Sequence, residues 1–464
     1  MDAAKAHQLW EASVLPAICE YTTIPCLSPD FDAQWERSRH LHEAASLLAR
    51  WCEERKVPAM HVDVLSPPGR TPMVVVEVAG RGQARGTVVV YGHLDKQPPF
   101  EGWRTGLGPY TPVREGDRLY GRGTADDGYA CFAALSALEM LADAELDHPR
   151  VLVLIEASEE SGSPDLAVYL AELADRIADP RLVVCLDSGG LSYDRLWLTT
   201  SLRGNLVATL AVEVLTEGVH SGAAGGIVPT SFRLLRQLLD RVEDSASGEI
   251  RLAELHADVP AGHADPTAAG WSALTSFPIV PGLVLCGEDD AERLVRRAWA
   301  PSLTVTGMDG VPAVRDGGNV LRPSTTAKLS VRLPPSVKAA EAARTLEAAL
   351  VADPPNGAKV RVHVETPATG WAAPPVPAWV TDAFAAASRE VLGNPPGSFG
   401  EGGTIPFLAM LSERYPEVPL VATGVLGPGS NAHGPNEYLH LPTAEAVTVA
   451  TARLVASAAA GGSR

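Results

Sequence analysis

The sequence predicts an α/β protein whose main domain is interrupted by a second, ferredoxin-like α+β domain. Three observations lead to this prediction. Short apolar runs alternate with helical patterns in residues 1–203, the order strand, helix, strand, strand, helix, strand follows in residues 204–370, and the first pattern returns in residues 371–464. We therefore expect a discontinuous main domain, built from the first and last segments, with the middle segment as an insert.

The first segment contains short runs rich in Val, Ile and Leu that lack polar alternation. Such runs are typical of strands buried on both faces of a sheet. Ala130 to Ala144, which is rich in Ala and Leu, predicts a helix between them. This alternation favours a largely parallel sheet covered by helices. The predicted strands are Met73 to Val78, Thr87 to Tyr91, Val151 to Ile155 and Leu182 to Leu186.

The middle segment has a different order of elements, which is that of a ferredoxin-like unit. Its predicted strands and helices, in chain order, are Leu206 to Leu215, the helix Thr230 to Asp240, Ser302 to Thr306, Ala327 to Leu333, the helix Val337 to Val351 and Lys359 to Glu365. Residues 245–300, rich in Ala, Asp and Pro, carry no assignment. Long connections of this kind are often functional.

After Thr366 the first pattern resumes. The sequence predicts helices at Val376 to Leu392 and Pro442 to Ala458, on either side of the apolar segment Pro419 to Val425. These elements complete the main domain, and the last residues, AAAGGSR, are expected to be frayed.

Composition and charge exclude several classes of function. The formal net charge of −18 argues against nucleic acid or an anionic membrane surface as a partner. The N-terminus lacks a basic region followed by an apolar core, and no apolar run is long enough to span a membrane. Six cysteines are scattered without a CxxC pair, which favours reduced thiols. We therefore expect a soluble, cytoplasmic protein.

Five candidate metal ligands lie at or just after predicted strands, or in loops where open α/β sheets place their sites. Each has an ordinary explanation when taken alone: a polar pair, acids before a helix, exposed carboxylates or a surface imidazole. Together, two imidazoles and three carboxylates suit two cations that share a carboxylate. The five residues are His93, Asp126, Glu160, Asp187 and His433.

The adjacent acids Glu159 and Glu160 would repel one another if both were buried without a cation. In extended chain their side chains point apart, so that one can bind a metal while the other faces water. Asp95, two residues after His93, is placed to hold the second ring nitrogen of that imidazole.

Seven motifs occur in one order over nearly the whole chain: GHLD, GRGTADD, EASEESG, LDSGG, HSGAAGG, EGGTIP and HGPNE. As a set they resemble the co-catalytic zinc hydrolases, the family of carnosinase, glutamate carboxypeptidase, succinyl-diaminopimelate desuccinylase and aminoacylase. The QPP after HLDK and the chain length resemble the dipeptidase branch of that family.

The resemblance implies a zinc-peptidase-type three-layer catalytic domain interrupted by a lid through which two subunits form a homodimer. It implies two Zn²⁺ per subunit, although Mn²⁺ and Co²⁺ also suit the donor set. Asp126 would bridge them, and the Asp126–Asp127 peptide bond would be cis. The remaining roles are His93 and Asp187 at one metal, Glu160 and His433 at the other, Glu159 as general base and Asp95 as the partner of His93.

The resemblance also implies a set of substrate contacts. His220 matches a lid histidine that reaches the site of the partner subunit. Asn319 and Arg332 match substrate contacts of the lid, and Gly403 and Thr404 match contacts of the catalytic domain. The chain departs from carnosinase-like sequences at Gly128 and Gly400, where lysine and arginine are usual, which puts nearby substrate contacts in question.

These features predict an enzyme that cleaves the peptide bond of a dipeptide or small peptide-like substrate. Three alternatives stay open: an N-acyl-amino-acid deacylase or desuccinylase, an amide-bond-forming enzyme on the same scaffold, and a catalytically silent metal-binding dimer. The sequence leaves the substrate side chains and the direction of exo-cleavage, as aminopeptidase or carboxypeptidase, undetermined.

Overall fold

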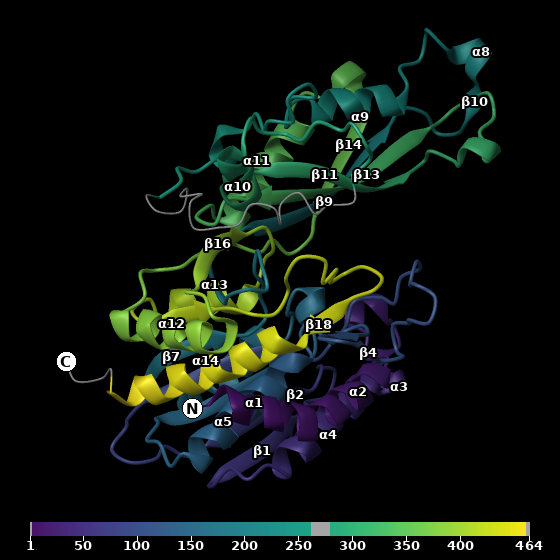
Figure 1. Ribbon diagram of the computed structural model, residues 1–464. Coiled ribbons are helices and arrows are strands. Elements are labelled where there is room, and N and C mark those ends of the chain that lie inside the picture. Colours follow the sequence, from purple (N-terminus) through teal and green to yellow (C-terminus); the bar gives the residue numbers. More distant parts are fainter. Residues whose placement is uncertain (1, 261–278, 461–464) are drawn as a thin grey trace.

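The computed structural model describes residues 2–260 and 279–460, which form a main domain and a lid (Figure 1). A nine-stranded sheet is the centre of the main domain. Its strand order is β1 (Met60–Leu65), β2 (Met73–Val78), β6 (Arg150–Glu156), β3 (Thr87–His93), β7 (Pro180–Cys185), β17 (Leu420–Ala422), β8 (Trp197–Leu202) and β15 (Trp371–Ala372), with β16 (Gly397–Glu401) beside β8.

The sheet is parallel at its centre and mixed towards its edges. β6, β3, β7 and β17 run in one direction, whereas β1 and β2 pair with their neighbours in the antiparallel sense. β8 is antiparallel to β17 and β15 and parallel to β16. The expectation of a largely parallel sheet is therefore wrong at the edges. An apolar run does not encode strand direction, and the connection of residues 66–72 between β1 and β2 is too short for a crossover helix.

Both faces of this sheet are buried, which explains the continuous apolar runs. In β6, Val151, Val153 and Ile155 point to one face and Leu152 and Leu154 to the other. The first face is covered by α1 (Ala3–Leu9), α2 (Leu15–Thr23), α4 (His40–Glu53), α5 (Tyr129–Asp143), α12 (Ala378–Leu392) and α14 (Leu441–Ala460). The second is covered by α6 (Leu166–Glu172), α7 (Ala174–Ile177) and α13 (Pro406–Arg414). The predicted three-layer catalytic domain is thus confirmed.

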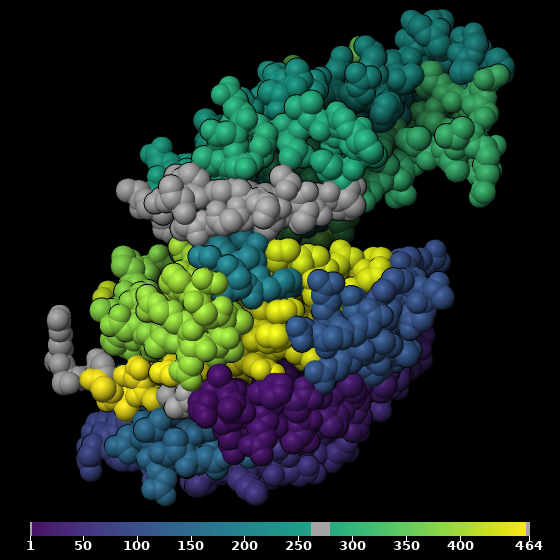
Figure 2. Space-filling view, in the orientation of Figure 1, coloured from purple at the N-terminus to yellow at the C-terminus, as the bar shows by residue number. Residues whose placement is uncertain are grey.

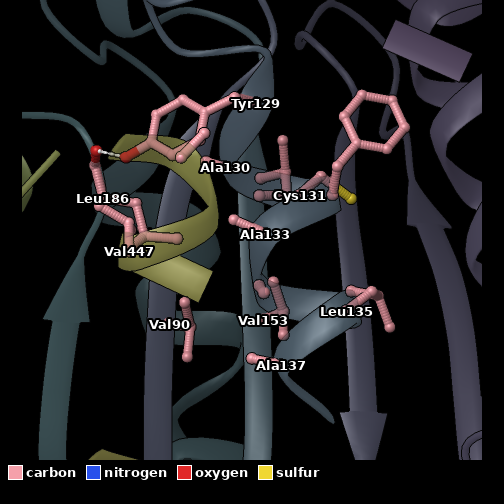
Figure 3. Packing of buried hydrophobic residues seen from close by; sticks show 14 of the residues in the cluster. Val90, Tyr129, Ala130, Cys131, Ala133, Leu135, Ala137, Val153, Leu186 and Val447 are labelled. Atoms are coloured by element: carbon pink, nitrogen blue, oxygen red, sulfur yellow. Dashed lines mark hydrogen bonds between the residues drawn. The ribbon is translucent and has the colours of Figure 1, made fainter. Parts of the chain in front are cut away.

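Helix α5 is buried along nearly its whole length because it lies between the sheet and α14. Figure 3 shows its alanines against Val90 and Val153, with Val447 of α14 close by. Small side chains let the helix approach the strands closely. The hydroxyl of Tyr129, at the start of α5, donates a hydrogen bond to the carbonyl of Leu186, 2.5 Å away. This bond ties the start of α5 to the carboxyl end of β7.

The lid contains a four-stranded antiparallel sheet in the order β11 (Ser302–Asp309), β13 (Ser324–Leu333), β9 (Gly204–Glu213) and β14 (Lys359–Val364). The two central strands, β9 and β13, alternate between buried and more exposed residues, and α9 (Ser231–Leu239) and α11 (Ala339–Val351) cover the buried face. This is the predicted ferredoxin-like arrangement. β9 starts directly after β8, and β15 returns the chain to the main sheet.

The sequence left residues 245–300 unassigned. Among the described residues of this stretch, one helix contacts the main domain. This is α10 (Asp290–Trp299), which begins after the N-cap Asp289 and packs against β16 of the main domain. Residues 261–278 of that stretch lie outside the described residues. A lid segment therefore contacts the main domain.

At the far end of the lid, β10 (Val219–His220) pairs with β12 (Val320–Leu321) and leads into the short helix α8 (Ser221–Ala224). Figures 1 and 2 show this lid tip projecting away from the main domain.

Two further predictions concern cysteines and membrane segments. All six cysteines are free thiols, and four of them are buried, as the sequence predicted. Within residues 2–260 and 279–460, no helix combines the length and apolar character needed to cross a bilayer.

Candidate metal centre

The candidate ligands come together because three of them follow neighbouring strands at one edge of the sheet. His93 ends β3, Glu160 follows β6 and Asp187 follows β7, and these strands are parallel. The carboxyl ends of parallel strands meet at a single edge, which is where α/β sheets hold ligands. Asp126 lies in the turn before α5, and His433 lies in the loop before β18 (Tyr438–His440).

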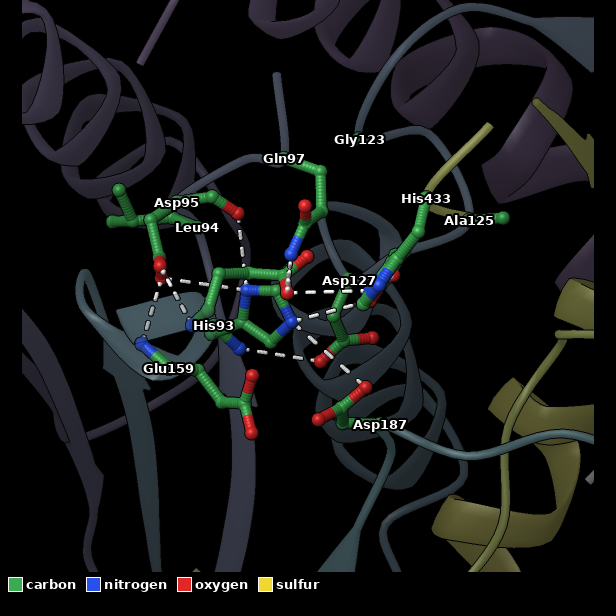
Figure 4. A network of polar contacts seen from close by, with 12 residues as sticks. His93, Leu94, Asp95, Gln97, Gly123, Ala125, Asp127, Glu159, Asp187 and His433 are labelled. Atoms are coloured by element: carbon green, nitrogen blue, oxygen red, sulfur yellow. Dashed lines mark hydrogen bonds and ion pairs between the residues drawn. The ribbon is translucent and has the colours of Figure 1, made fainter. Parts of the chain in front are cut away.

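The five side chains form two groups that share Asp126. Figure 4 shows His93, Asp187 and His433 pointing toward one another. In the first group, Nε2 of His93 lies 3.3 Å from Oδ1 of Asp126 and 3.8 Å from Oδ1 of Asp187. In the second, Nε2 of His433 lies 3.0 Å from Oδ2 of Asp126 and 3.2 Å from Oε2 of Glu160. The candidate ligand atoms of each group lie within 4.8 Å of one another. One carboxylate therefore presents a different oxygen to each group.

Carboxylates outnumber imidazoles in this buried region. Burial raises the pKa of Asp187 and of Glu159 well above the ordinary values, and neighbouring carboxylates add to the effect. Burial opposes the charge on His93, yet its contacts with Asp126, Asp187 and Asp95 outweigh burial and raise its pKa well above the usual range. The site therefore favours positive charge among these carboxylates.

Asp126 differs from the other acids of the site. Burial works against its charge, but contacts with His433 and His93 outweigh burial and hold its pKa well below the ordinary value. The peptide bond that joins it to Asp127 is cis, as the motif resemblance implied.

The residues present fit a pair of divalent cations. Among the described residues, no hydrogen-bond partner serves the buried Nε2 of His93 or the buried Oε1 of Glu160, and both belong to candidate ligand residues. A metal ion would satisfy both atoms and the excess negative charge. Mixed imidazole and carboxylate donors suit zinc, and also suit manganese or cobalt. His433 has 55% of its side chain exposed, so the centre opens to solvent on that side.

Asp95 connects the first group to the turn that carries the two glutamates. Nδ1 of His93 lies 3.1 Å from the carbonyl oxygen of Asp95 and 3.4 Å from its carboxylate. That carboxylate accepts hydrogen bonds from the backbone N–H groups of Glu159, at 3.2 Å, and Glu160, at 3.0 Å. Asp95 therefore holds the ring of His93 and the turn together (Figure 4).

Glu159 and Glu160 do not lie in extended chain, and that prediction is wrong. They begin the 3₁₀ turn Glu159–Ser161 that follows β6. The two backbone contacts to Asp95 stabilise this turn. The carboxylate of Glu160 lies against His433 and receives a hydrogen bond from Gln97. Glu159 belongs to neither of the two candidate metal groups.

The candidate substrate residues form two separate groups. His220 and Asn319 lie together at the lid tip, where the backbone N–H of Ser221 donates to the carbonyl of Asn319. His220 is exposed, and within the described residues its ring contacts only the backbone of Gly222. The second group lies where lid and main domain meet, and there Arg332 donates to Oγ1 of Thr404, 3.1 Å away, next to Gly403.

The comparisons with known proteins agree with this site. Residues 89–458 match the sequence profile described as Peptidase family M20/M25/M40. The chain belongs to this family. It is 28% identical over 385 residues to the cysteinylglycine-S-conjugate dipeptidase of Corynebacterium striatum, with 80% of each chain covered. It is also 28% identical over 394 residues to the Beta-Ala-His dipeptidase of Homo sapiens, covering 80% of this chain and 74% of that protein.

Solved structures show the same fold. The dipeptidase Dug1p of Saccharomyces cerevisiae has a TM-score of 0.78 at 20% identity, and the match covers 98% of both chains. The family predicted from the motifs is therefore confirmed, and this M20 chain is a metallopeptidase close to dipeptidases of that family.

The two departures of this M20 chain from the carnosinase-like pattern have steric causes. A Cβ on Gly128 would lie 2.1 Å from Cε1 of Tyr21. A Cβ on Gly400 would lie 2.5 Å from Cβ of Ala298, in α10. No longer side chain fits at either position, so no lysine or arginine acts from them.

Three residues of this M20 site received no role from the sequence. Asp127 is buried, and its carboxylate accepts a hydrogen bond from the backbone N–H of His93. Arg122 and Glu437 form a buried ion pair between the Asp126 turn and the His433 loop. Arg122 and Glu437 stand inside the GRG and HGPNE motifs, so the signal was present, but only the fold brings them together.

Proposed function

We propose that this chain is a di-zinc dipeptidase in which Glu159 is the general base. The observation that carries the proposal is the pair of ligand groups joined by Asp126, with the half-buried Glu159 beside them and belonging to neither. His93, Asp126 and Asp187 are the proposed ligands of one zinc, and Asp126, Glu160 and His433 those of the other.

The proposed mechanism divides the work between the cations and the chain. Two cations held by these residues would supply Lewis acidity, which lowers the pKa of a water molecule and polarises a carbonyl group. Glu159 accepts the proton of the attacking water and then donates it to the leaving amine. Asp95 keeps the ring of His93 and the Glu159 turn in place throughout.

The residues at the junction of lid and main domain are proposed to bind the substrate. The guanidinium of Arg332 has the shape to hold a carboxylate, and the hydroxyl of Thr404 and the backbone of Gly403 lie next to it. His220 and Asn319 lie on the lid tip, and we propose that they act in the site of a second subunit of a homodimer, where His220 stabilises the oxyanion.

The substrate proposed is a small peptide. Both curated relatives described above are named dipeptidases, and each match covers most of this chain. The free thiols are typical of a reducing compartment, so we propose that the enzyme acts in the cytoplasm.

A substrate panel tests this function. The purified protein, stripped of metal and then reconstituted with Zn²⁺, is assayed against dipeptides and N-acyl amino acids. We expect hydrolysis of dipeptides that a chelator abolishes and Zn²⁺ restores. Turnover of N-acyl amino acids alone would assign a deacylase, and zinc binding without chelator-sensitive turnover of either class would assign a silent binding protein.

A further inference from the structure

A buried ion pair joins the two loops that carry Asp126 and His433. Nη1 of Arg122 lies 2.6 Å from Oε2 of Glu437, and the two side chains are 1% and 0% exposed. These residues are far apart in sequence, and neither belongs to the two candidate metal groups. A fully buried charge pair is unfavourable unless its remaining hydrogen bonds are satisfied, so its other contacts matter.

The carboxylate of Glu437 organises the backbone of the Asp126 turn. It accepts hydrogen bonds from the N–H groups of Gly123 at 3.0 Å, Ala125 at 3.1 Å and Asp126 at 3.2 Å. Three backbone donors thus converge on one side chain. The position of the Asp126 backbone is therefore set by a residue of the His433 loop.

Arg122 makes the reciprocal contact. Its Nη2 donates to the carbonyl oxygen of Gly434, 2.6 Å away, directly after His433. The loop that receives this bond is strained, because the non-glycine residues Asn431, His433 and Asn436 have φ of 53°, 62° and 64°. A backbone held at these positive φ values is stabilised by contacts from outside the loop. The hydrogen bond from Arg122 to Gly434 is one such contact.

We propose that Arg122 and Glu437 are positioning residues that fix the distance between Asp126 and His433, and thereby preorganise the Asp126, Glu160 and His433 group for its cation. The inference rests on the proposed function of these residues as metal ligands. His93 and Asp187 need no such device, because both follow paired strands of the main sheet. The ion pair should therefore matter more for one metal than for the other.

Metal titration of Glu437→Gln tests this selectivity. The full-length, metal-free variant is titrated with Zn²⁺ by calorimetry and with Co²⁺ by visible absorption. Of the two metal ions that one chain would bind, we expect one to bind about ten- to a hundredfold more weakly, the usual effect of losing a residue that orients metal ligands. The other should be weakened less, because Glu437 positions only Asp126 among its proposed ligands. Glu445→Gln is the matched control, since that carboxylate pairs with His7 away from both groups.

Arg122→Lys provides a second test if Glu437→Gln does not fold. A single ammonium keeps the charge but cannot reach both Glu437 and the Gly434 carbonyl, so the same cation should be weakened. Unchanged affinity for both cations, or equal weakening of both, in a variant with native circular dichroism would overturn the inference. Because metal binding is measured without substrate, selective weakening would stand even if the panel of peptides showed no hydrolysis.

Discussion

The carboxylate of Glu159 is the acid of the site with the fewest partners. Its neighbour Glu160 contacts His433 and Gln97, and Asp95 receives two backbone hydrogen bonds. Across residues 2–260 and 279–460, the Glu159 carboxylate has no hydrogen bond or ion pair, and only the backbone of this residue is held. A half-buried carboxylate that lies next to ligands but is not needed to hold a metal is free to transfer a proton.

We therefore predict that Glu159→Gln retains its metal and loses activity. The amide has the size of the carboxylate but cannot accept a proton, so kcat should fall by about 10²- to 10⁴-fold. Steady-state kinetics and metal analysis on the same sample measure the two quantities. Glu413→Gln, on the exposed surface of α13, serves as control, and near-normal turnover by the Glu159 variant would remove this residue from the mechanism.

The raised pKa of Glu156 predicts how the stability of the protein depends on pH. It is buried at the end of β6, and burial, helped by the charge of Asp95, raises its pKa from 4.5 to about 7, although Tyr91 and Ser163 donate hydrogen bonds to it. Between these two values the folded protein keeps a proton that the unfolded chain has lost. The free energy of unfolding of the metal-free protein should therefore fall as the pH rises through this window, by roughly 3 kcal/mol at most.

Denaturant unfolding at several pH values, for the wild type and Glu156→Gln, measures this contribution. The wild type should lose stability relative to the variant as the pH rises towards about 7, and the difference should level off above that pH. Two curves that stay parallel across the window would show that Glu156 does not carry this proton.

At the scale of single elements, Gly128 determines how closely the start of α5 approaches α2. We predict that Gly128→Ala lowers the free energy of unfolding by about 1–3 kcal/mol, because the new methyl group would lie 2.1 Å from the Tyr21 ring and 2.4 Å from the carbonyl oxygen of Gly123. Gly108→Ala is the matched control, since its nearest neighbour would be 3.5 Å away. Equal stabilities in denaturant titration would show that α5 can shift without penalty.

Hydrophobic periodicity predicted most helices and strands, because the apolar pattern of each element follows from the face that it buries. β2 has the predicted bounds, and β9 and α9 differ from theirs by one or two residues. Strand direction and the packing of α10 depend on neighbours distant in the sequence, so local patterns did not contain them.

The residues of the site also differ in how far the sequence alone predicts them. Residues at the ends of apolar strands, such as His93 and Asp187, were candidates from the pattern alone, because strand ends are where α/β sheets place ligands. Pairing the motifs with a known family supplied the remaining roles. The link between Arg122 and Glu437 depends on a loop and a turn more than 300 residues apart in sequence that meet only in the folded chain.

At the scale of the whole molecule, the proposed action of His220 in a second subunit predicts that one chain does not complete its own site. His220→Ala and Glu159→Gln should each be inactive as homodimers, the first because its partner lacks the histidine and the second because it lacks the base. Mixed and allowed to exchange subunits, they should recover about a quarter of wild-type turnover, since half of the dimers contain one intact site.

Light scattering tests whether the chain forms a dimer, and the mixing assay measures the recovery of activity. A mixture whose activity stays at the mean of its parents would show that each chain works alone or that His220 has no part in catalysis. Each variant assayed alone at the same total concentration is the control for residual activity.

The contact between α10 and β16 limits how the lid can move. Gly400 lets the helix lie against the strand with no side chain between them, and the ion pair of Arg297 with Glu401, at 2.7 Å, reinforces the contact. The corner where β8 passes into β9 lies beside it, since the Arg203 side chain reaches the carbonyl of Ala300. A swinging lid would therefore have to pivot about this corner, so that the tip bearing His220 sweeps a wide arc while Arg332 and Thr404 hardly change their separation.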